Sequence, residues 1–212
     1  MVMVGAHLEL QERRNNMFLN TTILKRLMKE AWKGAGLTVG KENDELFLFG
    51  GYWIVRAQED FIPNTIKGLI VELAGELPQD GTIFKTIKDC GNQYELQGNS
   101  TYNIIEAAKK TNCAFAKTNI FMKHGITLCR VLQNVNSNKT VLMNNTLVDI
   151  VDPSLIDEPN GETEVIGPTA ETPDSFALYW HNNVSAFLAC IRTTDAEKEI
   201  EFLELLEGLE MH

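Results

Sequence analysis

Apolar side chains recur at helical spacing early in the chain, where they predict a helix over residues 20–34. They lie at i, i+1, i+4, i+5, i+8 and i+9 and therefore share one face: Ile23, Leu24, Leu27, Met28, Ala31 and Trp32. Polar residues at 20–22 can cap the first turn, and Gly34 or Gly36 can end the last one.

Short alternating segments follow this helix and predict three strands over residues 37–58, with turns at 41–44 and 50–51. Residues 64–77 return to helical spacing and stop at Pro78. A hairpin turning at residues 90–92 follows. The first half is therefore expected to run helix, three strands, helix, two strands.

The second half starts at the polar break of residues 98–101 and contains weaker patterns. The expected elements, in order, are a helix at 102–110, strands at 119–124, 126–134 and 139–151, an acidic loop at 152–174, a hairpin at 175–193 and an acidic helix at 195–210.

These patterns predict an α+β protein made of two similar halves, each a helix with an antiparallel sheet, followed by an acidic C-terminal helix. The halves are assigned to residues 17–98 and 99–212. Residues 1–16 are expected to form a flexible arm, because Met17 directly precedes the first clear element. The first residues do not resemble a signal peptide, and no apolar run is long enough to span a bilayer, so we expect a cytoplasmic protein without a membrane partner.

Charge is sorted into blocks along a chain whose formal net charge is −10. Residues 1–35 hold six Lys and Arg against three Asp and Glu, and residues 101–139 hold six against one. Residues 140–191 hold eight acids and no Lys or Arg. A lysine stripe is usually just a solvated helix face, but basic helices in both halves also suit contact with a phosphate backbone.

Motifs of known chemistry are missing from the sequence. There is no phosphate-binding glycine loop, no HExxH, no nucleophile elbow and no paired Cys/His spacing for zinc. The acidic loop does not match a calcium-binding loop either. We therefore expect neither an enzyme nor a cofactor or metal, although a site assembled from distant residues stays open.

Two aromatic pairs, Tyr52-Trp53 and Tyr179-Trp180, lie in expected strands near turns. Alternation sends one member of each pair inward and one outward. Trp53 and Trp180 are therefore candidate anchors for a partner protein, and the alternative is that these aromatic residues simply cover the core.

Residues 18–96 resemble one domain of a DNA sliding clamp in the order of their elements. The likeness lies in FLNTTILKRLMKEAWKG and in IPNTIKGLIVELAGELPQDGTIFKTIKDCGNQYEL, where a short Pro-containing segment enters the second helix and an LP-x-x-G turn leaves it. Clamps are acidic proteins with basic helices around a central hole, so the resemblance implies DNA contact by the basic helices. The candidate DNA-binding residues are Lys25, Arg26, Lys29, Lys33, Lys67, Lys109 and Lys110.

Three functions follow as hypotheses. The first is a non-enzymatic, clamp-like DNA-contacting processivity or scaffold protein that tethers a replication partner, with a homo-oligomer as one arrangement. The second is an acidic inhibitor that mimics DNA against a host-defence or other nucleic-acid protein, using residues 149–174 and 195–210. The third is an enzyme with a dispersed site. In general character, a small acidic chain without catalytic motifs also resembles phage and prophage accessory proteins.

Overall fold

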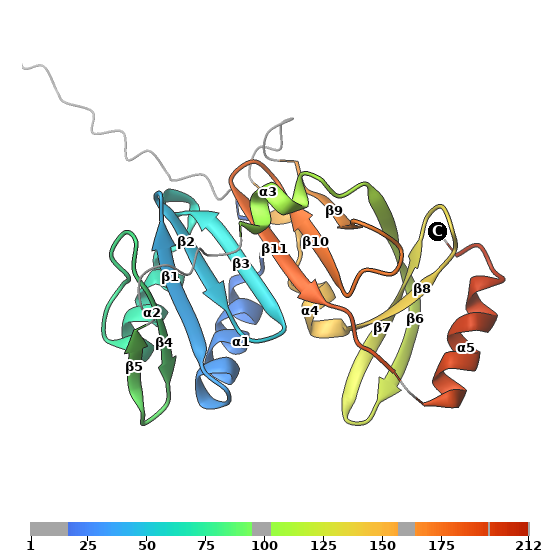
Figure 1. Ribbon diagram of the computed structural model, residues 1–212, viewed down its shortest axis with the longest axis horizontal. Coiled ribbons are helices and arrows are strands. Elements are labelled where there is room, and N and C mark those ends of the chain that lie inside the picture. Colours follow the sequence, from blue (N-terminus) through green and yellow to red (C-terminus); the bar gives the residue numbers. More distant parts are fainter. Residues whose placement is uncertain (1–16, 95–102, 157–163, 195, 212) are drawn as a thin grey trace, which may run out of the picture.

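Eleven antiparallel strands form one continuous sheet in the order β5-β4-β1-β2-β3-β11-β10-β9-β6-β7-β8 (Figure 1). The structure is a computed structural model that describes residues 17–94, 103–156, 164–194 and 196–211. The sheet is antiparallel throughout and is accompanied by separate α-helices, which confirms the α+β class. The arm predicted at residues 1–16 lies outside the described residues.

The first half supplies five strands and two α-helices. They are α1 (Thr21–Lys33), β1 (Leu37–Glu42), β2 (Glu45–Phe49), β3 (Trp53–Gln58), the 3-10 helix η1 (Glu59–Phe61), α2 (Asn64–Ala74), β4 (Ile83–Ile87) and β5 (Gly91–Tyr94). This order is the predicted one. Asn20 is the N-cap of α1, where its side-chain oxygen accepts hydrogen bonds from the backbone N–H groups of Thr22 and Ile23 at 3.0 and 3.2 Å.

The second half supplies the other six strands and three short or acidic helices. They are α3 (Ile104–Ala108), β6 (Cys113–His124), β7 (Thr127–Asn134), β8 (Thr140–Asn144), α4 (Asn145–Asp149), the 3-10 helix η2 (Pro153–Leu155), β9 (Ile166–Ala170), β10 (Ala177–His181), β11 (Ser185–Cys190) and α5 (Glu197–Glu207). The hairpin and the terminal helix match the prediction.

β3 and β11 join the two halves at the centre of the sheet. They pair antiparallel along five residues, with Val55 opposite Phe187. Their side chains enter one large core that also contains residues of α1, α2 and α4. The two halves therefore share both a sheet and a core.

The opposite face of the sheet carries the other two helices. Ile104 and Ile105 of α3 pack on Tyr179 and Leu188, which alternate with the large-core residues of β10 and β11. α5 covers the β6-β7-β8 end of the same face through Leu206. Figure 1 shows α3 in front of the sheet and α1 behind it.

The strand predicted at 139–151 is wrong in its second part, which forms α4. The chain leaves β8 at Asn144, whose side-chain oxygen accepts a hydrogen bond from the N–H of Thr146 at 2.9 Å and so starts a helix. Leu147 and Val148 are then buried on the α1 side of the sheet. An apolar run of this length fits a buried helix as well as a strand, and the Asn cap decides for the helix.

The acidic loop predicted at 152–174 is wrong over residues 166–170, because β9 lies there between β10 and β6. Pro168 and Gly167 argued against a central strand. The register between β9 and β10 shifts between Tyr179 and His181, so the strand bulges where the proline falls. Buried Thr169 and Ala170 then continue the ladder.

Polar contacts fix the position of α5. Thr140 donates its backbone N–H to Glu207 Oε1 at 3.0 Å and its hydroxyl to the carbonyl of Leu203 at 3.1 Å. At the start of the helix, the Thr194 hydroxyl donates to Glu199, and His124 Nδ1 lies 2.8 Å from Glu199 Oε2. The Thr194 hydrogen bond, together with His124, holds the pKa of the Glu199 carboxyl below its usual value.

Trp53 and its neighbour Tyr52 provide a test of the core. Trp53 is 1% exposed, whereas its neighbour Tyr52 is 45% exposed. We expect Trp53→Ala to lower the free energy of unfolding by about 3–5 kcal/mol, because it leaves a cavity in the large core. Tyr52→Ala is the matched control and should cost about 1 kcal/mol or less. Urea unfolding would measure both, and equal losses would contradict this core assignment.

Docking of α5 should weaken in acid through Glu199. A carboxyl whose pKa is lower in the folded than in the unfolded state stabilises the fold above its unfolded pKa, and this contribution disappears as pH falls through the folded pKa. Glu199→Gln should therefore lower the melting temperature at neutral pH, with the difference from the parent chain shrinking below about pH 4. Glu201→Gln, on the exposed side of α5, is the control; an identical pH profile for both variants would be inconsistent with this role.

Candidate nucleic-acid interface

The predicted basic stripe of α1 faces solvent on one side of the sheet. Leu24, Leu27 and Met28 enter the large core, which turns the opposite side of α1 outward. Its basic residues are exposed at Arg26, Lys29 and Lys33 and half-buried at Lys25. The structure therefore brings these four cations together as predicted.

Weak contacts hold two of these cations. Arg26 Nε lies 3.9 Å from Glu30 Oε1, and Lys29 Nζ lies 3.7 Å from Glu72 Oε1 on α2, with all four side chains about half exposed. Such solvent-exposed pairs stabilise a protein by roughly 0–1 kcal/mol, so neither carboxylate holds its cation strongly. Lys25 and Lys33 form no ion pair with another residue in the described part of the chain.

Lys67 on α2 is less accessible than the α1 cations. Its side chain is 16% exposed, and its Nζ lies 3.7 Å from Glu59 Oε1. Glu59 is also bound by Lys41, whose Nζ lies 2.6 Å from Oε2. The hydrogen bond from Lys41 is the main reason that the pKa of Glu59 lies below its usual value. Lys67 is thus part of an internal ion-pair cluster at the edge of the α1 surface.

Lys109 and Lys110 lie away from the other predicted cations. They follow α3, whose apolar side chains pack on the opposite face of the sheet from α1. Lys109 Nζ also lies 3.0 Å from Glu106. The structure does not bring these two lysines to the surface formed by α1.

Strands β6 and β7 contribute further cations, which are not among the predicted DNA-binding residues. Lys117 lies two residues after Phe115, and Arg130 lies two residues before Leu132; both of these apolar residues belong to the α1-side core. Side chains two residues apart on a strand share a face. After the register shift, Phe121 pairs with Arg130 and therefore lies on the same face as Arg130. Lys123, two residues further along β6, lies on this face too. The sequence signal was that Lys117 and Lys123 belong to the basic segment of residues 101–139.

Arg130 is the centre of this second group. Its guanidinium carbon lies 4.6 Å from the centre of the Phe121 ring, and Nη1 lies 3.7 Å from Asp149 Oδ1. Its Nε is buried without a hydrogen-bond partner among the described residues. Burial, and then the nearby Arg130, lower the pKa of Lys117 from its ordinary value. An anion bound beside Lys117 and Arg130 would relieve this repulsion.

Arg26 connects the two groups. Its Nη2 donates to the Thr146 hydroxyl of α4 at 3.3 Å, and α4 in turn contacts β7 and β8. We name the combined surface the basic face; its cations are Lys25, Arg26, Lys29, Lys33, Lys117, Lys123 and Arg130. It is carried by one continuous sheet.

The two predicted partner anchors are buried, and this part of the prediction needs correction. Trp53 is 1% and Trp180 is 0% exposed, and both enter the large core, whereas Tyr179 is buried beneath α3 on the other face. The Trp53 ring lies against Gly50, where any side chain would collide with it. Tyr52 is the outward residue of the first pair. It lines an apolar cavity of about 390 Å³ with Phe176 and Leu188.

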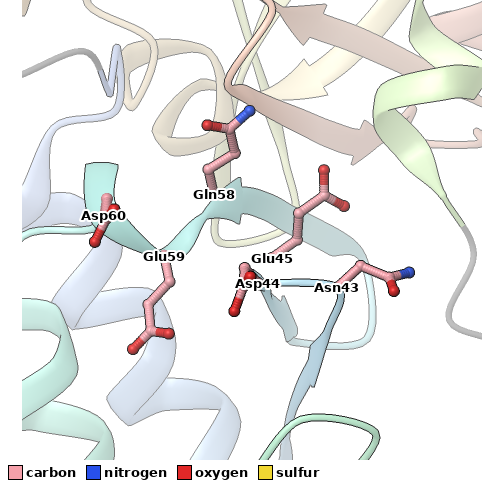
Figure 2. A pocket seen from close by; sticks show the side chains of 6 residues that line it. All are labelled: Asn43, Asp44, Glu45, Gln58, Glu59 and Asp60. Carbon is pink, nitrogen blue, oxygen red and sulfur yellow. The ribbon is translucent and has the colours of Figure 1, made fainter.

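A polar cavity of about 380 Å³ lies where the β1-β2 turn meets the end of β3 (Figure 2). Figure 2 shows Glu45 and Glu59 pointing to opposite sides. Glu45 Oε2 is already 2.5 Å from Arg56 Nε, and Glu59 is held by Lys41. The described residues contain no group of three or more His, Cys, Asp or Glu side chains arranged to hold a metal ion.

Comparison with known proteins adds no family assignment. No protein-family model matches the chain, and no curated protein is significantly similar to it. Within the described residues, no helix combines the length and apolarity needed to cross a bilayer. A function for this protein must therefore be inferred from the chemistry of its surfaces.

The electrostatic effect of Arg130 on Lys117 can be tested directly. Because Arg130 contributes to the lowered pKa of Lys117, Arg130→Gln should move that pKa back toward its ordinary value, while the larger effect of burial stays. Carbon-detected NMR titration of the lysine side chains would measure the shift. Arg192→Gln is the control, and an unchanged Lys117 pKa in Arg130→Gln would contradict the proximity.

Proposed function

We propose that this protein is a non-enzymatic, clamp-like protein that contacts duplex DNA independently of sequence and acts as a processivity factor or scaffold. The observation that carries the proposal is the basic face, where α1 and the β6-β7 hairpin present cations from distant parts of the chain on one side of one sheet. The acidic α5 lies on the other side. A protein with net charge −10 can bind DNA when its charges are separated in this way.

The spacing of the α1 lysines suits a phosphate backbone. Lys25, Lys29 and Lys33 repeat every four residues, so they extend over about 12 Å of helix. Phosphates of one DNA strand recur every ~3.4 Å along its axis, so this stripe reaches several of them. Flexible lysines give affinity without reading bases, which supports sequence-independent contact.

The arrangement of α1 and α2 supports the clamp-like part of the proposal, because both helices lie on the same side of the sheet (Figure 1).

The sheet edge at β8 limits how subunits could assemble. At β8, the Leu142 carbonyl accepts a hydrogen bond from Arg192 N–H at 2.7 Å, and Glu207 binds Thr140. Strand pairing at β8 is therefore blocked, and any ring of subunits would close through other surfaces.

Charge-reversal variants test whether the basic face, and no other surface, binds DNA. Lys29→Glu/Lys33→Glu should weaken low-salt binding to a random-sequence duplex at least about tenfold and reduce the salt slope by about 2, because two phosphate contacts are lost. Lys117→Glu/Lys123→Glu should act in the same direction. Fluorescence anisotropy across a salt series would measure each variant.

Lys109→Glu/Lys110→Glu is the matched control, because it makes the same charge change on the opposite face. It should bind DNA like the parent chain. If all three double variants bind equally well, or if the parent chain does not bind duplex DNA at low salt, the proposed function is wrong. Light scattering after size exclusion would give the oligomeric state in the same buffers.

A further inference from the structure

α5 presents an apolar stripe to solvent. Phe202, Leu205 and Leu209 are 37%, 69% and 54% exposed. Their spacing of i, i+3 and i+7 places them on one side of the helix, continuing just past its last residue. Scattered exposed apolar residues are ordinary, but an aligned set on one helix is characteristic of a docking surface.

The fold itself does not require this stripe. α5 is held to the sheet by buried Leu206 and partly buried Leu203 and Met211, and by its hydrogen bonds with Thr140. Gln133 Nε2 also donates to the carbonyl of Leu209 at 2.7 Å. These contacts fix the orientation of the helix, so the outward apolar side chains are preorganised for another molecule.

The charges beside the stripe identify the kind of molecule. Residues 196–211 contain six glutamates and one lysine, and Glu197, Glu201 and Glu204 are exposed on the outer side. Their carboxylates would repel nucleic acid. They would attract Lys and Arg side chains that flank an apolar surface, as on a cationic amphipathic helix.

We propose that the outward face of α5 binds a cationic amphipathic helical segment of a partner protein. A second copy of this chain fits less well, because pairing two α5 helices would bring their glutamates together. α1 of a second copy offers cations, but no residue of α1 is among the large apolar side chains that are exposed. α5 lies on the opposite side of the sheet from the basic face, so this site does not depend on DNA binding.

A labelled synthetic helix is a suitable probe. An amphipathic peptide of leucine and lysine would be titrated with the full chain and followed by fluorescence anisotropy, beside a scrambled peptide of equal composition. Leu205→Gln/Leu209→Gln should weaken binding about tenfold or more, because two apolar contacts are lost. Glu201→Gln/Glu204→Gln should reduce the salt dependence. Ile126→Gln is the matched control, since Ile126 is fully exposed in the β6-β7 turn.

Each other outcome overturns the proposal. Equal binding by the leucine variant and the parent, or by the scrambled and amphipathic peptides, would show that α5 gives only non-specific charge attraction. Concentration-dependent dimers that disappear in Leu205→Gln/Leu209→Gln would assign the face to a second copy. Duplex binding of the same variant, expected to be unchanged, distinguishes failure here from failure of the DNA proposal.

Discussion

Pairing between β3 and β11 is the contact on which the rest of the structure depends. These strands lie far apart in the sequence, yet Trp53 to Ala57 of one align with Ser185 to Ala189 of the other. Ordering so long a loop has a large entropic cost, which the ladder and the burial of Val55 and Phe187 on the α1 side must offset. Without this junction the sheet would divide into two smaller sheets, and β3 and β11 would become exposed edge strands.

The junction also determines which charges share a face. Alternation along each strand sends neighbouring residues to opposite sides, so a continuous sheet transmits one orientation from β1 to β8. Lys117 and Arg130 thereby come to the side of α1, although they are encoded about a hundred residues later. The same geometry places α3 with Lys109 and Lys110 on the other side. The basic segment of residues 101–139 is thus divided between the two faces of the sheet.

Ion pairing separates structural cations from available ones. Arg56 is buried, with Nε 2.5 Å from Glu45 and Nη2 3.4 Å from Glu42, so it serves the fold at the end of the β1-β2 hairpin. Lys41 also stabilises the fold, through its ion pair with Glu59. The α1 cations instead make long, exposed contacts. Counting charges along the chain cannot make this distinction, because it depends on which carboxylate the fold brings near each cation.

Local patterns in the sequence determined α1, the β1-β2-β3 meander, α2, the last hairpin and α5, because periodicity, capping residues and turns act over a few neighbours. They also placed Lys25, Arg26, Lys29 and Lys33 on a solvent-facing stripe. Only the tertiary structure decided that Trp53 and Trp180 turn inward and that β9 passes through the sheet. It alone decided which cations meet, because strand pairing over long distances, and not local propensity, sets the side of the sheet on which each residue lies.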